Sequence, residues 1–251
     1  MLKHRVIPTL LYKDTALVKG VGFDSWRIVG AAMQAVRIYN MRDVDELIFL
    51  DITATRQRRS PDMQLVQDLA KECFMPLAVG GGISSTEDVR SLLKSGADKV
   101  VVNSALMECP DLIQEAAIQF GNQSIIASID CKLNDNMTYN VFTESGTRPT
   151  AEDPISHARN AEKLGAGEIM ICNIDRDGTF NGYDLELIKA IAQEVSVPVI
   201  ASGGAGEYSD FEDALEAGAS AVAAASMFHF TEQTPLEARN YLAQKGYPVR
   251  T

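Results

Sequence analysis

The chain has 251 residues, 46% of them apolar, so it can bury a sizeable core as one large domain or two small ones. Its formal net charge of −11 argues against nucleic acid or an anionic membrane surface as the main partner. No apolar run approaches the ~18–20 residues that a membrane-spanning helix needs, and no signal peptide precedes the first predicted strand, which favours a cytoplasmic protein.

Apolar, strand-like runs alternate with amphipathic helical stretches from one end of the chain to the other. Eight runs fit buried strands, at 6–11, 47–52, 77–79, 99–102, 125–129, 169–174, 199–201 and 221–225. Helices between them are predicted to begin at Thr86, Pro110 and Asp153. Continuous apolar runs separated by helices are typical of a parallel sheet covered by helices. Eight β/α units in about 250 residues predict a single-domain α/β protein, a (β/α)₈ TIM barrel spanning 1–251, with a doubly wound open sheet as the alternative.

The two halves of the chain repeat each other at an offset of 122 residues. The segment 76–83 (PLAVGGGI) matches 198–205 (PVIASGGA), and the same offset places Asp88 on Asp210 and Glu46 on Glu168. A closed barrel accommodates such a repeat without leaving edge strands. The sequence therefore predicts a barrel of two half-barrels, about 1–122 and 123–251.

The glycine segments also predict phosphate sites. Barrels of this kind carry their chemistry at the C-terminal ends of the strands, and they hold phosphates on backbone N–H groups of the loops that follow strands seven and eight. Those loops contain Gly203, Gly204, Ala225 and Ser226, and the repeat predicts a mirror site at Gly81, Gly82, Asn103 and Ser104. Two sites on opposite sides of the mouth predict a long ligand with a phosphate at each end. Glycines that only form tight turns are the alternative.

Asp130 is the strongest catalytic candidate in the sequence. It stands at the end of a strand, between Ile129 and Cys131. Core packing does not select a carboxylate at such a position. We expect a catalytic role, against the alternative that the side chain caps a nearby helix or loop amide.

Four charged residues stand at or just before the starts of strands one, two, four and six: Arg5, Glu46, Lys99 and Glu168. Side chains at these positions are predicted to meet as a ring around the bottom of the barrel axis. On the residues alone, a salt-bridged plug that closes the barrel is the favoured interpretation.

The remaining candidates for metal or redox chemistry give no signal. The three histidines are scattered and offer no metal-ligand spacing. The four cysteines have no paired spacing and are predicted to be reduced core residues. The sequence thus predicts neither a metal nor a cofactor.

Over essentially its whole length the chain resembles the HisF family, the cyclase subunit of imidazole glycerol phosphate synthase. The matching segments are 79–83 (VGGGI), 96–100 (GADKV), 102–104 (VNS), 175–179 (DRDGT), 182–185 (GYDL), 201–206 (ASGGAG) and 228–230 (FHF). The resemblance implies that a HisH-type glutaminase docks on the N-terminal face of the barrel and releases ammonia. Ammonia then passes a charged gate and the barrel interior, and reacts with a bisphosphorylated ribulosyl substrate to give imidazole glycerol phosphate and an aminoimidazole carboxamide ribotide.

The same resemblance implies roles for individual residues. It assigns the ammonia gate to Arg5, Glu46, Lys99 and Glu168, which changes the favoured interpretation of that ring from an inert plug to an ammonia entrance. It implies catalytic roles for Asp130 and Lys19, and substrate contacts for Asp177 and Gly178.

Leu11 is the important departure from the family pattern. The family has an aspartate there, which forms the acid/base pair of the cyclase with the residue matching Asp130. A general acid or base contributes ~10²–10⁴-fold, and leucine can neither give nor accept a proton. Asp14 lies three residues on, but its place in the loop is expected to aim it elsewhere.

Three functions fit this pattern. The chain is similar to HisF paralogues that, with a HisH-like protein, supply ammonia to a separate sugar amidotransferase, which turns an acetamido sugar into an acetamidino sugar. We favour this paralogue function over that of a histidine-pathway cyclase. An isomerase of the HisA type needs the same two aspartates and has no use for a gate.

Overall fold

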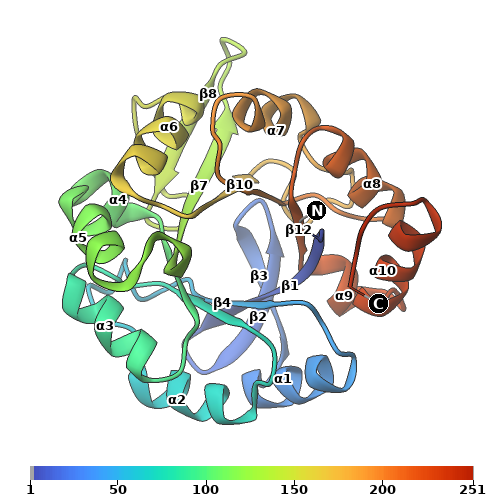
Figure 1. The fold of residues 1–251 in the computed structure, drawn as a ribbon, viewed down its shortest axis with the longest axis horizontal. Helices are drawn as coiled ribbons and strands as arrows, with labels where there is room; N and C mark the ends of the chain where they lie inside the picture. Colours follow the sequence, from blue (N-terminus) through green and yellow to red (C-terminus); the bar gives the residue numbers. More distant parts are fainter. Residues whose placement is uncertain (1–2, 251) are drawn as a thin grey trace.

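The computed structural model describes residues 3–250 and shows a closed barrel surrounded by helices (Figure 1). The barrel strands are β1 (Arg5–Lys13), β4 (Leu47–Asp51), β5 (Leu77–Gly80), β6 (Lys99–Val102), β7 (Ile125–Leu133), β10 (Glu168–Asn173), β11 (Val199–Ser202) and β12 (Ala221–Ala224). All neighbouring pairs are parallel, and the β7–β10 and β12–β1 pairings complete the ring. The predicted TIM barrel and its eight strands are confirmed.

Helices follow the strands and cover the outside of the barrel. They are α1 (Ala32–Met41), α2 (Met63–Glu72), α3 (Thr86–Lys94), α4 (Ser104–Glu108), α5 (Asp111–Phe120), α6 (Pro154–Leu164), α7 (Leu185–Ala192), α8 (Tyr208–Glu216), α9 (Ser226–Phe230) and α10 (Pro235–Gln244), with a 3₁₀ turn at Asn122–Ser124. Side chains at the N-termini fix several starts: Ser85 caps α3 and Asp153 caps α6. The helix starts predicted from the sequence are correct to within a residue or two.

Alternation along the strands separates two apolar regions. Outward side chains such as Val6 and Leu10 pack against the helices in the larger core. Inward side chains such as Ile7 form a smaller core inside the barrel, which also contains Ile48, Ala78, Val101, Ile126, Met170, Ile200, Ala221 and Ala223. The interior is therefore packed with side chains in its lower part, as is usual for a barrel of eight strands.

Two hairpin arms extend the barrel at its C-terminal mouth. One consists of β2 (Ala16–Val21) and β3 (Asp24–Gly30), which continue from β1, and the other of β8 (Tyr139–Thr143) and β9 (Arg148–Pro149), which continue from β7. The sequence predicted no strands at these positions. The reason is visible in β3, whose residues are mostly exposed, so that no apolar run marks it.

The repeated glycines hold backbone that other residues would not adopt without strain. Gly82 has φ +75° and Gly204 has φ +121°. An added Cβ would lie 2.4 Å from the carbonyl oxygen of Arg59 in the first case and 2.1 Å from that of Gly182 in the second. The loop conformation alone therefore requires glycine at both positions.

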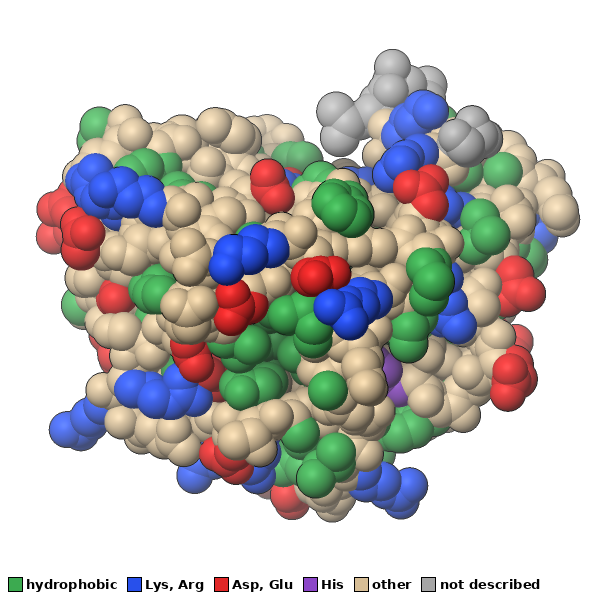
Figure 2. Space-filling view, turned by 90° about the horizontal axis from the view of Figure 1, so that it is seen from below, with side chains coloured by type: hydrophobic (Ala, Val, Ile, Leu, Met, Phe, Trp, Pro, Cys, Tyr) green, Lys and Arg blue, Asp and Glu red, His purple; other side chains and the backbone are tan. Residues whose placement is uncertain are grey.

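On the flank where α1 and α2 lie, charges of both signs are interspersed with apolar side chains (Figure 2). Among residues 3–250, no helix is long and apolar enough to cross a membrane. All four cysteines are free, but the prediction that all are core residues was wrong: Cys109 is exposed, because it lies in the turn between α4 and α5.

Candidate functional site

A cavity opens at the C-terminal mouth of the barrel, with about 1160 Å³ of empty space that includes the solvent-open mouth. Its wall includes every residue that was predicted to be catalytic or to bind phosphate or substrate: Lys19, Gly81, Gly82, Asn103, Ser104, Asp130, Asp177, Gly178, Gly203, Gly204, Ala225 and Ser226. The ends of six barrel strands and one hairpin arm bring these residues together. A concave site lined by a few convergent polar groups in this way is typical of a small-molecule site.

Asp130 points into this cavity from the end of β7. Its carboxylate accepts a hydrogen bond from Asn103 Nδ2 at 3.2 Å, and the same amide group donates to the carbonyl oxygen of Ser128 at 3.1 Å. Burial and the nearby charge of Asp177 raise the pKa of Asp130 to about 7, although the hydroxyl of Ser128 acts in the opposite direction. The side chain contacts other side chains rather than a backbone amide, so the capping alternative is wrong. A carboxyl group with this pKa can exchange protons near neutral pH.

Lys19 reaches the cavity from the hairpin arm. Its side chain is 1% exposed, and its ammonium group forms an ion pair with Asp177. The arm is also tied to this loop through its backbone, since Gly22 N–H donates to the carbonyl oxygen of Asp177 at 2.8 Å. One buried positive charge therefore lies beside the wall of the cavity.

Leu11 faces Asp130 across the mouth. On β1, Ile7 lies in the inner core, and Thr9 and Leu11 continue the inward alternation and line the cavity. In the barrel order, β1 and β7 are four strands apart in either direction, so the two strands lie on opposite sides. Asp14 is exposed and does not line this cavity, which agrees with the expectation that it is aimed elsewhere.

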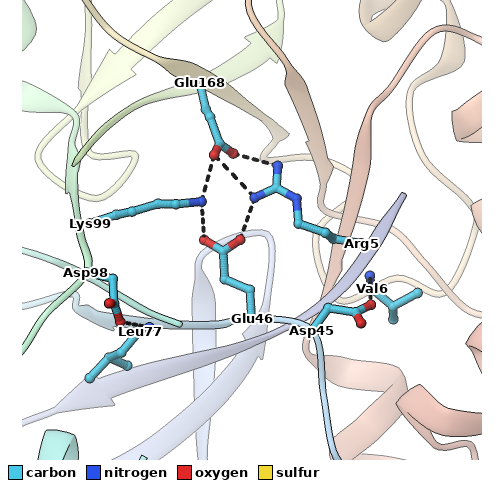
Figure 3. A network of polar contacts seen from close by, with 8 residues as sticks. All are labelled: Arg5, Val6, Asp45, Glu46, Leu77, Asp98, Lys99 and Glu168. Atoms are coloured by element: carbon cyan, nitrogen blue, oxygen red, sulfur yellow. Dashed lines mark hydrogen bonds and ion pairs between the residues drawn. The ribbon is translucent and has the colours of Figure 1, made fainter. Parts of the chain in front are cut away.

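At the opposite end of the barrel, Arg5, Glu46, Lys99 and Glu168 form a closed ring of ion pairs (Figure 3). The ammonium group of Lys99 lies 2.8 Å from Glu46 and 2.6 Å from Glu168, and the guanidinium group of Arg5 contacts both carboxylates from the other side. Burial alone would raise the pKa of Glu168, but the hydrogen bonds and charges of Arg5 and Lys99 outweigh it, so this pKa is lowered. The predicted ring is present, and its geometry fits a plug as well as a gate.

The ring is anchored by the residues next to it. Asp45 accepts a hydrogen bond from Val6 N–H at 2.9 Å, and Asp98 accepts one from Leu77 N–H at 2.8 Å (Figure 3). Asp45 also pairs with the buried Arg239 of α10 at 3.1 Å. These bonds fix the starts of β1 and β5, the strands that pair with those of Glu46 and Lys99.

A thin layer of the inner core separates the ring from the cavity. Val101, Met170 and Ala223 belong to that core and also line the cavity. Val101 is two residues beyond Lys99 on β6, which corresponds to about 7 Å of strand. The nine buried side chains of this inner core are all apolar: four isoleucines, three alanines, one valine and one methionine.

Several cavity residues were not predicted from the sequence. Thr9 and Ser128 could have been found by counting inward in steps of two from Leu11 and Asp130. Phe23 and Trp26 line the cavity from the hairpin arm, where no periodic pattern marked them.

Taken together, the fold and the two ends of its interior define a (β/α)₈ barrel with a polar cavity at its C-terminal mouth and an ion-pair ring at its N-terminal end. Residues 5–234 match the family model for histidine biosynthesis proteins. The chain is 47% identical over 250 residues to imidazole glycerol phosphate synthase subunit HisF of Endomicrobium trichonymphae. The matched region covers 100% of this chain and 96% of that relative. It is 47% identical to the protein of that name from Hyphomonas neptunium, with 100% of both chains covered, and 46% identical to that of Streptomyces griseus, with 99% of both covered. The chain belongs to the HisF family of histidine biosynthesis proteins.

Proposed function

We propose that this chain is an ammonia-conducting subunit that works with a HisH-type glutaminase and delivers ammonia to a phosphorylated acceptor at the cavity. The observation that carries the proposal is the alignment of its parts along one axis. The ring of Arg5, Glu46, Lys99 and Glu168 lies at one end, the cavity at the other, and a thin apolar layer between them. Ammonia is small and neutral in its reactive form, so it can cross an apolar layer without being bound there.

The N-terminal face offers a surface for the glutaminase. The helices run antiparallel to the strands, so their C-terminal ends lie at this face. Met41 ends α1, Phe74 follows α2 and Ile118 is in the last turn of α5, and these side chains are 80%, 87% and 78% exposed. Exposed apolar side chains of this size on the N-terminal face are what a docked partner protein would cover.

Leu11 decides between two forms of this function. Opposite Asp130 it provides no proton, so we propose that the chain is a paralogue that passes ammonia on to a separate sugar amidotransferase. That enzyme would convert an acetamido group into an acetamidino group. The chain would then be a conduit in the cytoplasm rather than the catalyst of ring closure.

The alternative is a cyclase of histidine biosynthesis that makes imidazole glycerol phosphate. The observation in its favour is the identity of 46–47% over full length with proteins named as that synthase's subunit, together with the retained Asp130 and Lys19. Both forms use the same ring and cavity, and they differ in whether this chain performs the chemistry.

The test is a steady-state assay of the purified chain with the bisphosphorylated ribulosyl substrate and an ammonium salt. We expect turnover at least ~10²-fold below that of a relative with both carboxylates. Leu11→Asp should recover part of this turnover, and the double variant Leu11→Asp, Asp130→Asn should lose the recovery. Full turnover by the unaltered chain would establish the cyclase and refute the paralogue.

A further inference from the structure

The loop between β10 and α7 carries the charge partner of Lys19. It runs from Asn173, the last residue of β10, to Asp184, which caps the N-terminus of α7. Within it, Asp177 pairs with Lys19 of the first arm (β2–β3), and the carbonyl oxygen of Asp177 accepts from Gly22 N–H at 2.8 Å. The position of Lys19 in the cavity wall therefore depends on how this loop is held.

Two buried side chains join the ends of the loop. Asn173 is 5% exposed and Asp184 is 8% exposed. The Oδ1 atom of Asn173 accepts from the backbone N–H groups of Asp175 at 2.9 Å and Arg176 at 3.3 Å, and its Nδ2 donates to Asp184 Oδ2 at 2.6 Å. The other carboxylate oxygen of Asp184 accepts from Leu187 N–H at 3.3 Å. One amide and one carboxylate thus fix the loop to the strand before it and to the helix after it.

Tyr139 brings the second arm (β8–β9) to the same carboxylate. It is the first residue of β8, and its hydroxyl donates to Asp184 Oδ2 at 2.6 Å. Burial and the hydrogen bond to Asp184 raise the pKa of Tyr139 well above its usual value, so the hydroxyl remains a donor at neutral pH. Hydrogen bonds to an ionised carboxylate are among the stronger ones in proteins. The second arm is therefore bonded to the loop that holds the first.

The shared oxygen makes the hydroxyl of Tyr139 matter beyond its own arm. Three hydrogen bonds compensate the buried charge of Asp184, from Tyr139, Asn173 and Leu187. Without the hydroxyl, Oδ2 keeps only the amide of Asn173. The same amide side chain holds the backbone of the loop two and three residues on, so a looser carboxylate should loosen the loop as well.

We propose that Tyr139 is a positioning residue: through Asp184 it fixes the loop that carries Asp177, and thereby holds the ammonium group of Lys19 in the cavity wall. This inference rests on the proposed function only in treating the cavity as the place where the chemistry occurs. A hydrogen bond that merely stabilised the second arm would leave Lys19 unaffected.

The test measures the reactivity of Lys19 in the full chain. Lys19 is 1% exposed on its side chain, so acetic anhydride should modify it slowly, as followed by mass spectrometry against the exposed Lys94. Tyr139→Phe should speed the modification of Lys19 at least about tenfold, as expected when a hydrogen bond to a charged group is lost. Hydrogen exchange at Gly22 N–H, followed by NMR, should rise by a similar factor, because its acceptor belongs to the same loop.

Tyr241→Phe is the matched control. Its hydroxyl also donates to a carboxylate, that of Glu212 at 2.7 Å, but it joins α10 to α8 on the outside of the barrel. Both rates should stay within about twofold of the unaltered chain. Unchanged reactivity of Lys19 in Tyr139→Phe, or an equal rise in Tyr241→Phe, would overturn the proposal.

A double-mutant cycle shows whether Tyr139 acts through Asp177. Asp177→Asn removes the charge partner of Lys19 and should itself speed the modification. In that background Tyr139→Phe should add less than about twofold, because the connection to Lys19 is already broken. The same tenfold increment in both backgrounds would refute the route through Asp177. If Asp177→Asn does not fold, the comparison of Tyr139→Phe with Tyr241→Phe decides.

These rates are measured without glutaminase, ammonia or acceptor. Failure of the positioning inference therefore leaves the ammonia function standing. Equally, a failure to transfer ammonia in the assembled complex would refute the proposed function without changing the expected reactivity of Lys19.

Discussion

Burial and the charge of Asp177 raise the pKa of Asp130 to about 7, so this carboxyl titrates within the physiological range. An aspartate in an unfolded chain has a pKa of about 3.9. Between these two values the folded chain binds more protons at this site than the unfolded chain does. The free energy of unfolding therefore falls as the pH rises from about 4 to about 7, and the full cost of the buried charge is present above pH 7.

Asp130→Asn should remove this dependence. The amide keeps the shape of the side chain and carries no charge, so the free energy of unfolding at pH 8 should rise by up to about 4 kcal/mol, with little change at pH 4. Denaturant unfolding across this pH range measures the effect. Asp14→Asn is the matched control, since Asp14 is exposed. Equal pH profiles for the unaltered chain and Asp130→Asn would contradict the raised pKa.

At the residue scale, the sequence predicted which residues line the cavity better than how they interact. Strand-end positions were enough to select Asp130 and Gly204, because parallel strands in a barrel end at one face. The ion pair of Lys19 with Asp177 was not predictable, because it depends on a hairpin arm that folds back over the mouth. The same holds for the hydrogen bond from Glu144 N–H to Ser104 Oγ, because only the second arm brings Glu144 into place.

At the scale of elements, equivalent carboxylates cap the N-termini of α3 and α8. Asp88 accepts hydrogen bonds from Ser84 N–H and Ser85 N–H, both at 3.0 Å, and Asp210 accepts from Gly206 N–H at 2.7 Å and Glu207 N–H at 2.9 Å. The repeat therefore preserves how a helix begins after each glycine loop. These caps hold the loop and the helix in one orientation.

Asp88→Ala should destabilise the fold by about 1–2 kcal/mol at neutral pH. Burial acts to raise the pKa of Asp88, but the bonds from Ser84 and Ser85 outweigh it and lower this pKa. A lowered pKa gives stability that is present above about pH 4 and is lost as the pH falls through the folded value. The difference between variant and unaltered chain should thus vanish in acid. Asp111→Ala is the control, because Asp111 is exposed in the first turn of α5, where no side-chain cap is present.

The hairpin arms mark the limit of prediction at this scale. Barrel strands are buried on both sides and give continuous apolar runs, whereas the arms expose much of their surface. In β3, Ile28 is 76% exposed and Trp26 is only partly buried, so neither periodicity nor an apolar run separates this strand from a loop. Long-range contacts with the loop at Asp177 hold it in place.

At the scale of the whole molecule, removing one charge from the ring of ion pairs distinguishes a structural plug from an ammonia conduit. Lys99→Leu leaves Glu46 and Glu168 with one cation instead of two. In a dry plug this change should cost ~3–5 kcal/mol of stability. In a wet entrance we expect a smaller loss, together with a fall in product formed per glutamine hydrolysed when the chain is assembled with a HisH-type glutaminase.

The measurement pairs this coupling ratio with the melting temperature. Lys94→Leu is the control, since Lys94 is an exposed lysine in the last turn of α3, the helix that leads into β6. Lost coupling with a modest change in melting temperature is the expected result. Unchanged coupling with a large loss of stability would make the ring structural.

The overall architecture could be read from the sequence because local and global signals agree: eight buried runs, helices between them and one internal repeat. The division into half-barrels at about residue 122 stays a prediction. This division concerns how the two repeats arose along the chain, and the contacts in a closed ring do not show that.

That closed ring also makes the starting point of the chain arbitrary. His4 N–H donates to the carbonyl oxygen of Pro248 at 2.7 Å, so the last described segment returns to the first. A circular permutant that joins these ends through a short glycine linker and opens between Asn122 and Gln123, both exposed, should keep the cavity and melt within several degrees of the parent. A permutant opened inside β7 should not fold. Circular dichroism and calorimetry distinguish the two, and the first permutant would begin at Gln123, with the second copy of the repeat preceding the first.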